Sequence, residues 1–543
     1  MKSLWNDSAA AACGDDPKAL RVYTSRLLGQ DPDLVLHGGG NTSVKMTEND
    51  FFGTPLETLF VKGSGWDLAT IEVAGFAPLR LDVLLQLAKC ASLSDTDMVR
   101  QQRLAMLDPG APNASVEAIL HAIIPFRFVD HSHADAVLAI TNAPDNEARV
   151  REVFGPRILT IPYVMPGFVL AKAVYERTRD VDWDQLDGIV LLNHGLFTFH
   201  DDARASYEQH IKLVTQAEEY LSSRASLAPR ATAEPAIDLQ ALAKLRACVS
   251  RFRGIPVLAK LDDSPALRAY ADRADIATIG ARGPVTPDHS IRTKRTPVVL
   301  TGNAEQDISD YASAYRAYFD QHNQDGLTCL DPAPRWAIWP GAGLIALGAD
   351  SREAAIIADI AAHTAKVVQL AESLGGWEAL SPADIFDVEY WELEQAKLRK
   401  QASAPPLRGK IALVTGAASG IGRATCEQFL KSGAAVVALD VDPKITTLFN
   451  SPAALGLICD LRNPEAIRQA VNATVRHFGG LDIVVSNAGV FSPGEPIETL
   501  SDATWDQSLQ LNLTQHKNLL QVSIPFLRAG IDPAIVVIGS KNV

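Results

Sequence analysis

The sequence has few cysteines, no long apolar run and no excess of basic residues. Six cysteines are scattered over 543 residues without a Cys-x-x-Cys pair, which excludes a disulfide framework and a cysteine zinc site. No stretch of 18 apolar residues occurs, and the first residues lack the apolar core of a signal peptide, so we expect no membrane span. Lys and Arg total 50 against 64 Asp and Glu, a net charge of -14, which argues against a nucleic-acid-binding protein.

The remaining composition is that of an ordinary folded protein. Hydrophobic residues make up 47% and charged residues 21% of the chain, which argues against disorder. At about 100–200 residues per domain, the length predicts three or four domains. We therefore expect a large cytoplasmic protein, and an enzyme rather than a structural one.

The clearest domain boundary falls in the segment 399–409, where two consecutive prolines cannot continue a helix. After it, short apolar runs alternate with helical patterns, which predicts a parallel sheet built from βαβ units. These runs are IALVTG, AAVVALD, LGLICDL, DIVVSNAG and AIVVIGS. Before it, we expect strands at 135–141 and 188–200 and helices at 203–224 and 352–374.

Two histidines, His131 and His133, alternate in the segment DHSH after an apolar run. In a strand, residues i and i+2 point to the same face, so both imidazoles can bind one metal ion. His194, in another strand-like run, can supply a third imidazole. Three neutral imidazoles with an open position are typical of a catalytic zinc site. Paired solvent-facing or core histidines are the alternative.

Two glycine-rich segments and a glutamate accompany the histidines. The segments HGGGNTS at 37–43 and KGSG at 62–65 can offer unobstructed backbone N–H groups to a phosphate. Tight turns are the alternative interpretation. Glu117 precedes a helical pattern at 118–124. A carboxylate there either stabilises the first turn of the helix or, beside a metal, exchanges a proton.

Together, these residues resemble the class II aldolase/adducin family over roughly residues 20–225. The resemblance implies a metal-dependent carbon–carbon lyase, with Glu117 as the general acid/base and His121 four residues after it. The implied ligands of Zn2+, or of another divalent metal, are His131, His133 and His194. The residues implied to bind the substrate phosphate are Asn41, Thr42, Ser64, Gly65 and Ser115.

This set of residues matches the chemistry of aldol cleavage. Breaking a C–C bond next to a ketone leaves an enediolate, whose charge a divalent cation stabilises as a Lewis acid. A carboxylate moves the proton, and the phosphate loops orient the substrate. Adducin-like members without activity lack the metal ligands, which are present here. A non-catalytic, adducin-like interaction module is the alternative from another class.

Further segments resemble bifunctional rhamnulose-1-phosphate aldolase/short-chain dehydrogenase proteins, a resemblance that implies rhamnose metabolism. They include IPYVMPGF, RGPVTPDHSIRTKR, PAPRWAIWPGAGLIALG and DVEYWELEQAKLRK. The resemblance implies a phosphorylated sugar substrate, split into dihydroxyacetone phosphate and lactaldehyde, and a homo-oligomer, a tetramer. Four basic side chains in the segment 282–295 form either an anion site or a solvated charged loop. They are Arg282, His289, Arg292 and Arg295.

The segment TGAASGIG at 415–422 follows a strand and opens a helix. Its glycines allow a pyrophosphate to approach the helix N-terminus closely. Asp440, at the end of the second strand, is placed to bind the ribose hydroxyls, which favours NAD over NADP. Asp460 and Leu461 follow the third strand, where an adenine contact is usual, and surface placement is the alternative.

Residues 410–543 resemble the short-chain dehydrogenase/reductase family. Asn512 and Ser540 correspond to its catalytic asparagine and serine. The residues implied to bind the nucleotide are Gly416, Ser419, Gly420, Ile421, Gly422, Asp440, Asp460, Leu461, Asn487, Ala488 and Gly489. The family's Tyr-x-x-x-Lys is absent, since no tyrosine follows Tyr390 and Lys541 cannot replace that lysine.

Without this tyrosine there is no general acid/base for hydride transfer. We therefore expect no dehydrogenase activity and only weak NAD binding from residues 1–543. The alternative is that the chain is a fragment of a working bifunctional aldolase and NAD-dependent aldehyde dehydrogenase.

The predicted fold is α/β: a class II aldolase/adducin-like α/β domain plus an incomplete Rossmann doubly wound parallel sheet. The predicted domains are an aldolase/adducin-like domain at 1–235, its α/β extension at 236–398, a linker at 399–409 and a dehydrogenase domain at 410–543, truncated before the Tyr-x-x-x-Lys motif.

Overall fold

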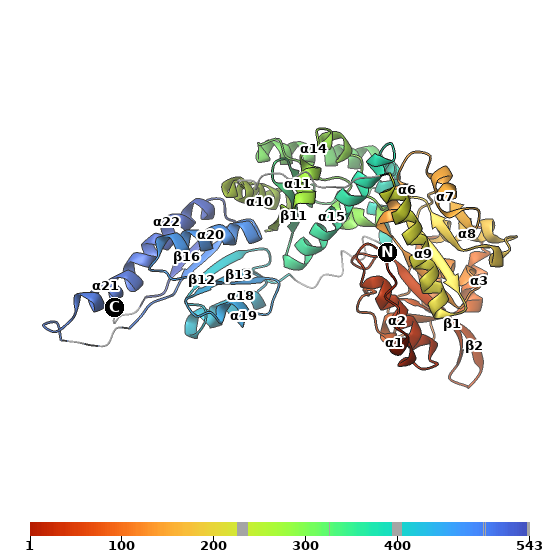
Figure 1. Ribbon diagram of the computed structural model, residues 1–543, viewed down its shortest axis with the longest axis horizontal. Coiled ribbons are helices and arrows are strands. Elements are labelled where there is room, and N and C mark those ends of the chain that lie inside the picture. Colours follow the sequence, from red (N-terminus) through yellow and green to blue (C-terminus); the bar gives the residue numbers. More distant parts are fainter. Residues whose placement is uncertain (225–236, 325, 394–403, 492–493, 495, 540–543) are drawn as a thin grey trace. The chain divides into compact units, whose positions relative to one another are not determined.

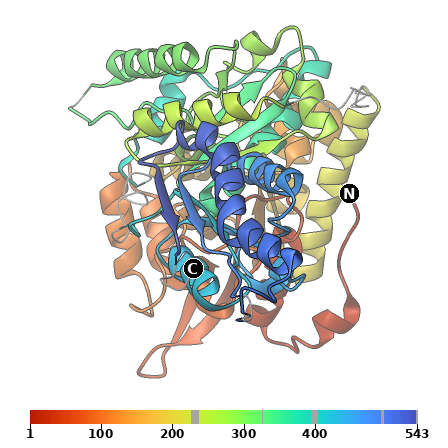
Figure 2. The same ribbon diagram turned by 90° about the vertical axis from the view of Figure 1, so that its left-hand side faces the viewer.

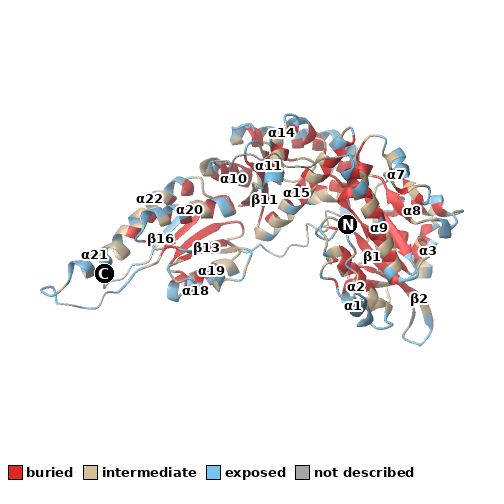
Figure 3. Ribbon diagram, viewed as in Figure 1, coloured by how far each residue is buried: buried red, intermediate tan, exposed pale blue. Residues whose placement is uncertain are grey.

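The computed structural model describes residues 1–224, 237–324, 326–393, 404–491, 494 and 496–539 (Figure 1). The chain forms two compact units. The first comprises residues 1–228, 282–291 and 363–399, and the second comprises residues 229–281, 292–362 and 400–543. The strands at the centre of each unit are buried (Figure 3).

The first unit is built on a seven-stranded sheet with the order β3-β2-β1-β4-β7-β6-β5. Neighbouring strands are antiparallel except for the parallel pair β5 and β6. The strands are β1 Asn41–Asn49, β2 Pro55–Lys62, β3 Phe76–Arg80, β4 Phe128–Ser132, β5 Ile158–Ile161, β6 Gly188–Leu191 and β7 Gly195–His200. Helices α5 (Ala118–Ile123) and α8 (Phe168–Thr178) pack on the face of β4 that carries Val129.

The opposite face of β4 is polar and completely buried. Asp130 accepts a hydrogen bond from the buried Arg21 guanidinium of α2 (Pro17–Gly29), and Ser132 Oγ lies 2.6 Å from His210 Nε2 on α9 (Ala203–Ser222). Buried charges must be paired, so these contacts resist a shift of β4 by one residue, which would reverse its faces. The alternate histidines are thereby kept on the α5 face.

One predicted element of this unit is wrong. Residues 135–141, predicted as a strand, form helix α6 (Asp135–Thr141), and every residue of this helix is buried. A short run that is apolar on all sides has no periodicity to distinguish a buried helix from a strand. The predicted helices at 203–224 and 352–374 are confirmed as α9 and as α15 (Ser351–Ser373).

Within the described residues, α15 is the one helix long and apolar enough to cross a membrane by length and composition. Its most apolar stretch is 56% buried inside the protein. Core helices of folded proteins pass the same test, so the finding is weak evidence for a span.

The second unit contains two sheets. The smaller has the order β8-β11-β10-β9, with β8 Leu258–Asp262, β9 Val298–Val299, β10 Trp336–Trp339 and β11 Gly343–Gly348. The larger is parallel, with the order β14-β13-β12-β15-β16. Its strands are β12 Ile411–Thr415, β13 Ala435–Asp440, β14 Ala454–Ile458, β15 Ile483–Ser486 and β16 Ala534–Val537.

Helices cover both faces of the parallel sheet (Figures 1 and 2). On one face lie α18 and α19, and on the other lie α20 and α22. Their bounds are α18 Gly420–Lys431, α19 Ile445–Leu448, α20 Pro464–Phe478 and α22 Gln515–Leu527. This is the predicted doubly wound, Rossmann-like arrangement, and the mixed α/β fold class is confirmed.

The predicted linker at 399–409 is only partly described, and its second half is packed. A Cβ on Gly409 would lie 2.2 Å from the Pro256 carbonyl oxygen, and Arg408 pairs with Asp350 at 2.8 Å. Ala243 of α10 (Leu239–Arg253) shares a core with the parallel sheet. Within the second unit, residues 229–281 and 292–362 therefore pack with the residues that follow this segment.

Replacing Lys45 with methionine is expected to stabilise the first unit. The Lys45 ammonium of β1 is buried and donates to the Phe126 carbonyl at 2.9 Å, and burial lowers its pKa to about 7. The cost of burying the charge is full below about pH 7 and disappears by about 10.5, so stability rises with pH across this window. Lys45→Met should gain roughly 1–4 kcal/mol at neutral pH.

The measurement is thermal unfolding at about pH 7 and about pH 10. The control is Lys212→Met, at an exposed position of α9. A gain that is equal at both pH values, or that the control shares, would contradict the explanation by charge burial.

Candidate active site

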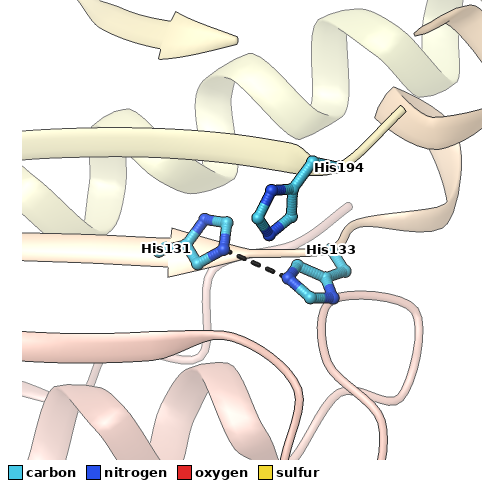
Figure 4. A group of neighbouring side chains, drawn as sticks. All are labelled: His131, His133 and His194. Carbon is cyan, nitrogen blue, oxygen red and sulfur yellow. Dashed lines mark hydrogen bonds between the residues drawn. The ribbon is translucent and has the colours of Figure 1, made fainter. Parts of the chain in front are cut away.

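Three histidines converge at one end of β4. His131 lies in β4, His133 directly follows it, and one ring nitrogen of each of these and of His194 lies within 4.8 Å of the others (Figure 4). The Nε2 atoms of His131 and His133 are 3.1 Å apart. His194 was expected in a strand. It lies instead in the turn between β6 and β7, where Asn193 has φ 58°.

His131 and His133 are held in the neutral form that binds metals. Burial, and then the other imidazoles, lower the pKa of His131 well below its ordinary value, and burial lowers the pKa of His133 to about 3. His131 Nδ1 lies 3.1 Å from the Leu196 carbonyl oxygen. The carbonyl only accepts, so Nδ1 carries the proton and Nε2 presents a lone pair toward the other rings.

Glu117 is the acidic group nearest to this cluster. It precedes α5, and its Oε1 and Oε2 lie 3.5 Å from His194 Nε2 and 3.6 Å from His131 Nε2. The pKa of Glu117 is raised above its ordinary value, because the effect of burial exceeds the opposing effect of nearby His194. Oε1 is buried and has no hydrogen-bond partner among the described residues. Buried polar atoms are almost always paired, so this oxygen fits a role toward a bound cation or substrate.

Asn41 holds Glu117 in this position. Its side-chain amide donates to Glu117 Oε2 and, at 3.0 Å, to Ser115 Oγ. The Asn41 side-chain oxygen Oδ1 contacts His121 Nε2, and His121 Nδ1 lies 2.8 Å from Ser43 Oγ. Asn41 and Ser115 thus lie beside the cluster, and their polar atoms orient the carboxylate.

Thr42 does not lie on the same face as these residues. Asn41 pairs with His131 across β1 and β4, whereas Thr42 pairs with Asp130. Successive residues of a strand point to opposite faces, and Thr42 Oγ1 accordingly lies 2.7 Å from Ser25 Oγ behind the sheet. The expectation that this side chain contacts a phosphate is corrected.

The two glycine-rich segments meet, as expected for a shared anion site. Lys62 Nζ donates to the carbonyl oxygens of Gly38 at 2.6 Å and Gly40 at 2.8 Å. Ser64 and Gly65 follow Lys62 and are exposed. Sequence reasoning missed Lys62 as a site residue. Its positive charge helps to lower the pKa of His133 and opposes the rise in the pKa of Glu117.

Gly195→Ala should disrupt the histidine cluster. A Cβ on Gly195 would lie 2.3 Å from the Ser132 carbonyl oxygen and 2.9 Å from a ring carbon of His131. The strands β4 and β7 would have to separate where the histidines converge, so we expect about 10–100-fold weaker Zn2+ affinity. Competition with a zinc-binding dye measures the loss, and Gly539→Ala, at a position with open space, is the control. An unchanged affinity would show that the close approach is unnecessary.

The glycine-rich loop between β12 and α18 has the predicted form. Gly416 and Gly420 have φ values of 64° and 52°, and a Cβ on Gly422 would lie 2.1 Å from the Gly416 carbonyl oxygen. Ser419 is the N-cap residue of α18 but makes no side-chain capping bond. The helix N-terminus therefore stays open to an anion.

Asp440 and Asn487 frame this loop. The Asp440 carboxylate accepts from the backbone N–H of Ala418 at 2.9 Å and of Asp442 at 3.0 Å. The Asn487 side chain donates to the Thr415 carbonyl at 2.9 Å. These contacts fix the acid and the amide at the carboxyl ends of β13 and β15, the two strands that flank β12, where this type of sheet binds its ligands.

The other expected nucleotide-binding residues have less direct roles. Asp460 is paired with Arg462 at 2.8 Å, in keeping with surface placement, and Leu461 is buried. Asn512 binds both backbone groups of Val490, at 2.9 and 3.0 Å. Ser540 lies outside the described residues. Ile421, Ala488 and Gly489 lie in or beside the loops described above.

The residue most clearly missed by sequence reasoning is Asp288. Its Oδ2 lies 3.6 Å from His133 Nε2, although about 150 residues separate the two in the sequence. Arg282 is one of the basic residues that the sequence offered as an anion site. It pairs with Glu372 at 2.7 Å, so its charge is neutralised within the protein.

Three domain families match the chain. The class II aldolase and adducin N-terminal domain matches residues 19–221, the class II aldolase second domain matches residues 236–398, and the short chain dehydrogenase family matches residues 410–543. Together these matches cover most of the chain.

Individual relatives agree with this division. The "Uncharacterized oxidoreductase YuxG" of Bacillus subtilis is 29% identical over all of this chain and 82% of its own length. The L-fucose dehydrogenase of Bos taurus is 37% identical over 22% of this chain, and the chain spans 45% of that protein. The chain likewise spans about half of other dehydrogenases that it matches.

A solved structure matches the first part of the chain. It is the N-terminal class II aldolase domain of a conserved protein from Thermoplasma acidophilum, 42% identical over 41% of this chain and 99% of that domain, with a TM-score of 0.38. The chain consists of class II aldolase domains followed by a short-chain dehydrogenase domain.

Proposed function

We propose that the chain is a metal-dependent aldolase that cleaves a ketose 1-phosphate, with rhamnulose 1-phosphate as the first candidate, into dihydroxyacetone phosphate and lactaldehyde. The observation that carries this proposal is the meeting of three imidazoles with Glu117 Oε1, which has no hydrogen-bond partner among the described residues. A divalent cation held by His131, His133 and His194 supplies Lewis-acid stabilisation of the enediolate charge. Zn2+ suits an all-imidazole site best.

The residues around the cluster support the steps of this reaction. Glu117 is placed to move a proton at the carbon next to the ketone, and its buried position excludes bulk water from that proton. Asn41 and His121 keep its carboxylate in one orientation. The positive charge of Lys62 and the exposed backbone at Ser64 and Gly65 fit the phosphate end of the substrate.

We further propose that the dehydrogenase domain binds NAD. The open N-terminus of α18 fits the pyrophosphate, and Asp440 at the end of β13 fits the ribose hydroxyls. Oxidation of the released aldehyde is proposed only for a protein that includes the family's Tyr-x-x-x-Lys motif. We also propose that the protein is cytoplasmic and forms a homo-oligomer, a tetramer. Its proposed partners include neither nucleic acid nor a membrane.

Metal analysis paired with an assay for dihydroxyacetone phosphate release tests the aldolase. We expect about one zinc ion per chain and release from rhamnulose 1-phosphate. Metal without release would keep the site but point to another phosphorylated sugar. No metal and no release, even after incubation with Zn2+, would refute the aldolase and favour a non-catalytic interaction module.

A further inference from the structure

The second aldolase domain places a short acidic turn beside the histidines. Residues 282–291 belong to the same compact unit as the seven-stranded sheet. Pro287–His289 forms a single 3-10 turn, which brings Asp288 Oδ2 to 3.6 Å from His133 Nε2. The Asp288 side chain is 38% exposed, whereas that of Glu117 is 7% exposed. Two carboxylates therefore approach one cluster, one of them buried and the other open to solvent.

Hydrogen bonds tie this segment to the turn that carries His194. Asn142 Nδ2 donates to the Val285 carbonyl at 3.2 Å, and Asn142 Oδ1 accepts from Asn193 Nδ2 at 2.6 Å. At the start of the segment, Arg282 donates to a side-chain oxygen and a backbone oxygen of the same unit, each at 2.7 Å. The position of the acidic turn is thus set by the same contacts that place a metal-binding histidine.

The two carboxylates reach the cluster at different histidines. Glu117 lies within 3.6 Å of His131 and His194, and Asp288 lies at that distance from His133. A substrate bound across the three imidazoles would meet one carboxylate on its buried side and the other on its open side.

Aldol cleavage moves protons at two different atoms. The carbinol hydroxyl loses its proton as its oxygen becomes the aldehyde carbonyl, and the C–C bond breaks. The bonding electron pair stays on the ketose fragment as an enediolate, which takes up a proton at carbon to give dihydroxyacetone phosphate. Nothing is oxidised or reduced overall. One carboxylate could move the proton from oxygen to carbon only by serving both atoms in turn, whereas two carboxylates on different sides of the substrate can each serve one atom.

We propose that Asp288 is the catalytic residue that accepts the carbinol proton, while Glu117 delivers the proton to the enediolate carbon. Asp288 then releases its proton to water and Glu117 takes one up, which restores both groups. The open side of the site is also where the aldehyde leaves. The second aldolase domain thus supplies a reacting group to the site of the first, an inference that rests on the proposed aldolase function.

Three measurements on the full chain test this division of roles. They are Zn2+ affinity, exchange of the C–H protons of dihydroxyacetone phosphate with D2O, and condensation of dihydroxyacetone phosphate with lactaldehyde. Exchange needs only the proton step at carbon. Asp288→Asn should slow condensation by about 10²–10⁴-fold, keep the exchange, and change the Zn2+ affinity by less than about tenfold. Glu378→Gln, at an exposed position of the same unit, should change none of the three.

Two outcomes would overturn the role of Asp288 but leave the aldolase function standing. One is condensation by Asp288→Asn at the wild-type rate. The other is a parallel loss of exchange and of bound metal in this variant, which would indicate a merely structural role. A wild-type protein loaded with Zn2+ that catalyses neither exchange nor condensation would instead refute the aldolase itself. The two failures are therefore distinguishable.

Discussion

Glu117→Gln is expected to slow sugar-phosphate cleavage by about 10²–10⁴-fold while the protein keeps its metal. The glutamine has nearly the same shape and can still bond Asn41, but it cannot take up or release a proton. The three imidazoles are untouched, so metal binding should continue. Exchange of the dihydroxyacetone phosphate C–H protons should fall with cleavage, because both need the same proton step.

The matched control is Glu72→Gln, which removes one negative charge at an exposed position of the same unit. It should leave cleavage, exchange and metal content at wild-type values. Full activity in Glu117→Gln would remove Glu117 from the proton transfer. Loss of metal along with activity would show instead that the carboxylate serves mainly to hold the ion.

Two histidines of the proposed metal site could be found from the sequence because their arrangement is local. The alternation of His131 and His133 places them on one face of an extended chain, and His131 lies in β4 with His133 directly after it. The same alternation separates Asn41 from Thr42, which the family pattern alone groups together. The dehydrogenase loop is also local, since its glycines follow one strand directly and open the next helix.

Contacts between distant segments could not be found in this way. Asp288 reaches His133 because a turn of the second aldolase domain packs against the first, and nothing in the residues around it marks that approach. Similarly, Arg246 on α10 meets Asp482 before β15 across 236 residues. A single sequence contains no signal for such pairs.

The Arg246–Asp482 pair leads to the second large expected effect. Both side chains are fully buried, with the guanidinium and carboxylate joined at 2.9 and 2.6 Å. Asp482 also accepts the backbone N–H groups of Ile411 and Ile531, at 2.8 and 2.6 Å. Arg246→Met would leave a buried carboxylate without its counter-charge, so we expect a loss of about 3–5 kcal/mol in the free energy of unfolding.

Urea unfolding of the full chain, followed in the second unit, measures this loss, and Arg423→Met is the control. Arg423 and Glu427 form an ion pair at 2.8 Å on the exposed side of α18, and cutting such a pair costs at most about 1 kcal/mol. In Arg246→Met/Asp482→Asn no charge remains unpaired, so the double variant should lose less than the sum of the two single ones. Additive losses, or a loss for Arg246→Met no larger than the control's, would mean that the pair does not join α10 to the parallel sheet. The expected result would instead mean that α10 and the parallel sheet, both in the second unit, fold together, so that neither can be cut away without exposing a buried charge on the other.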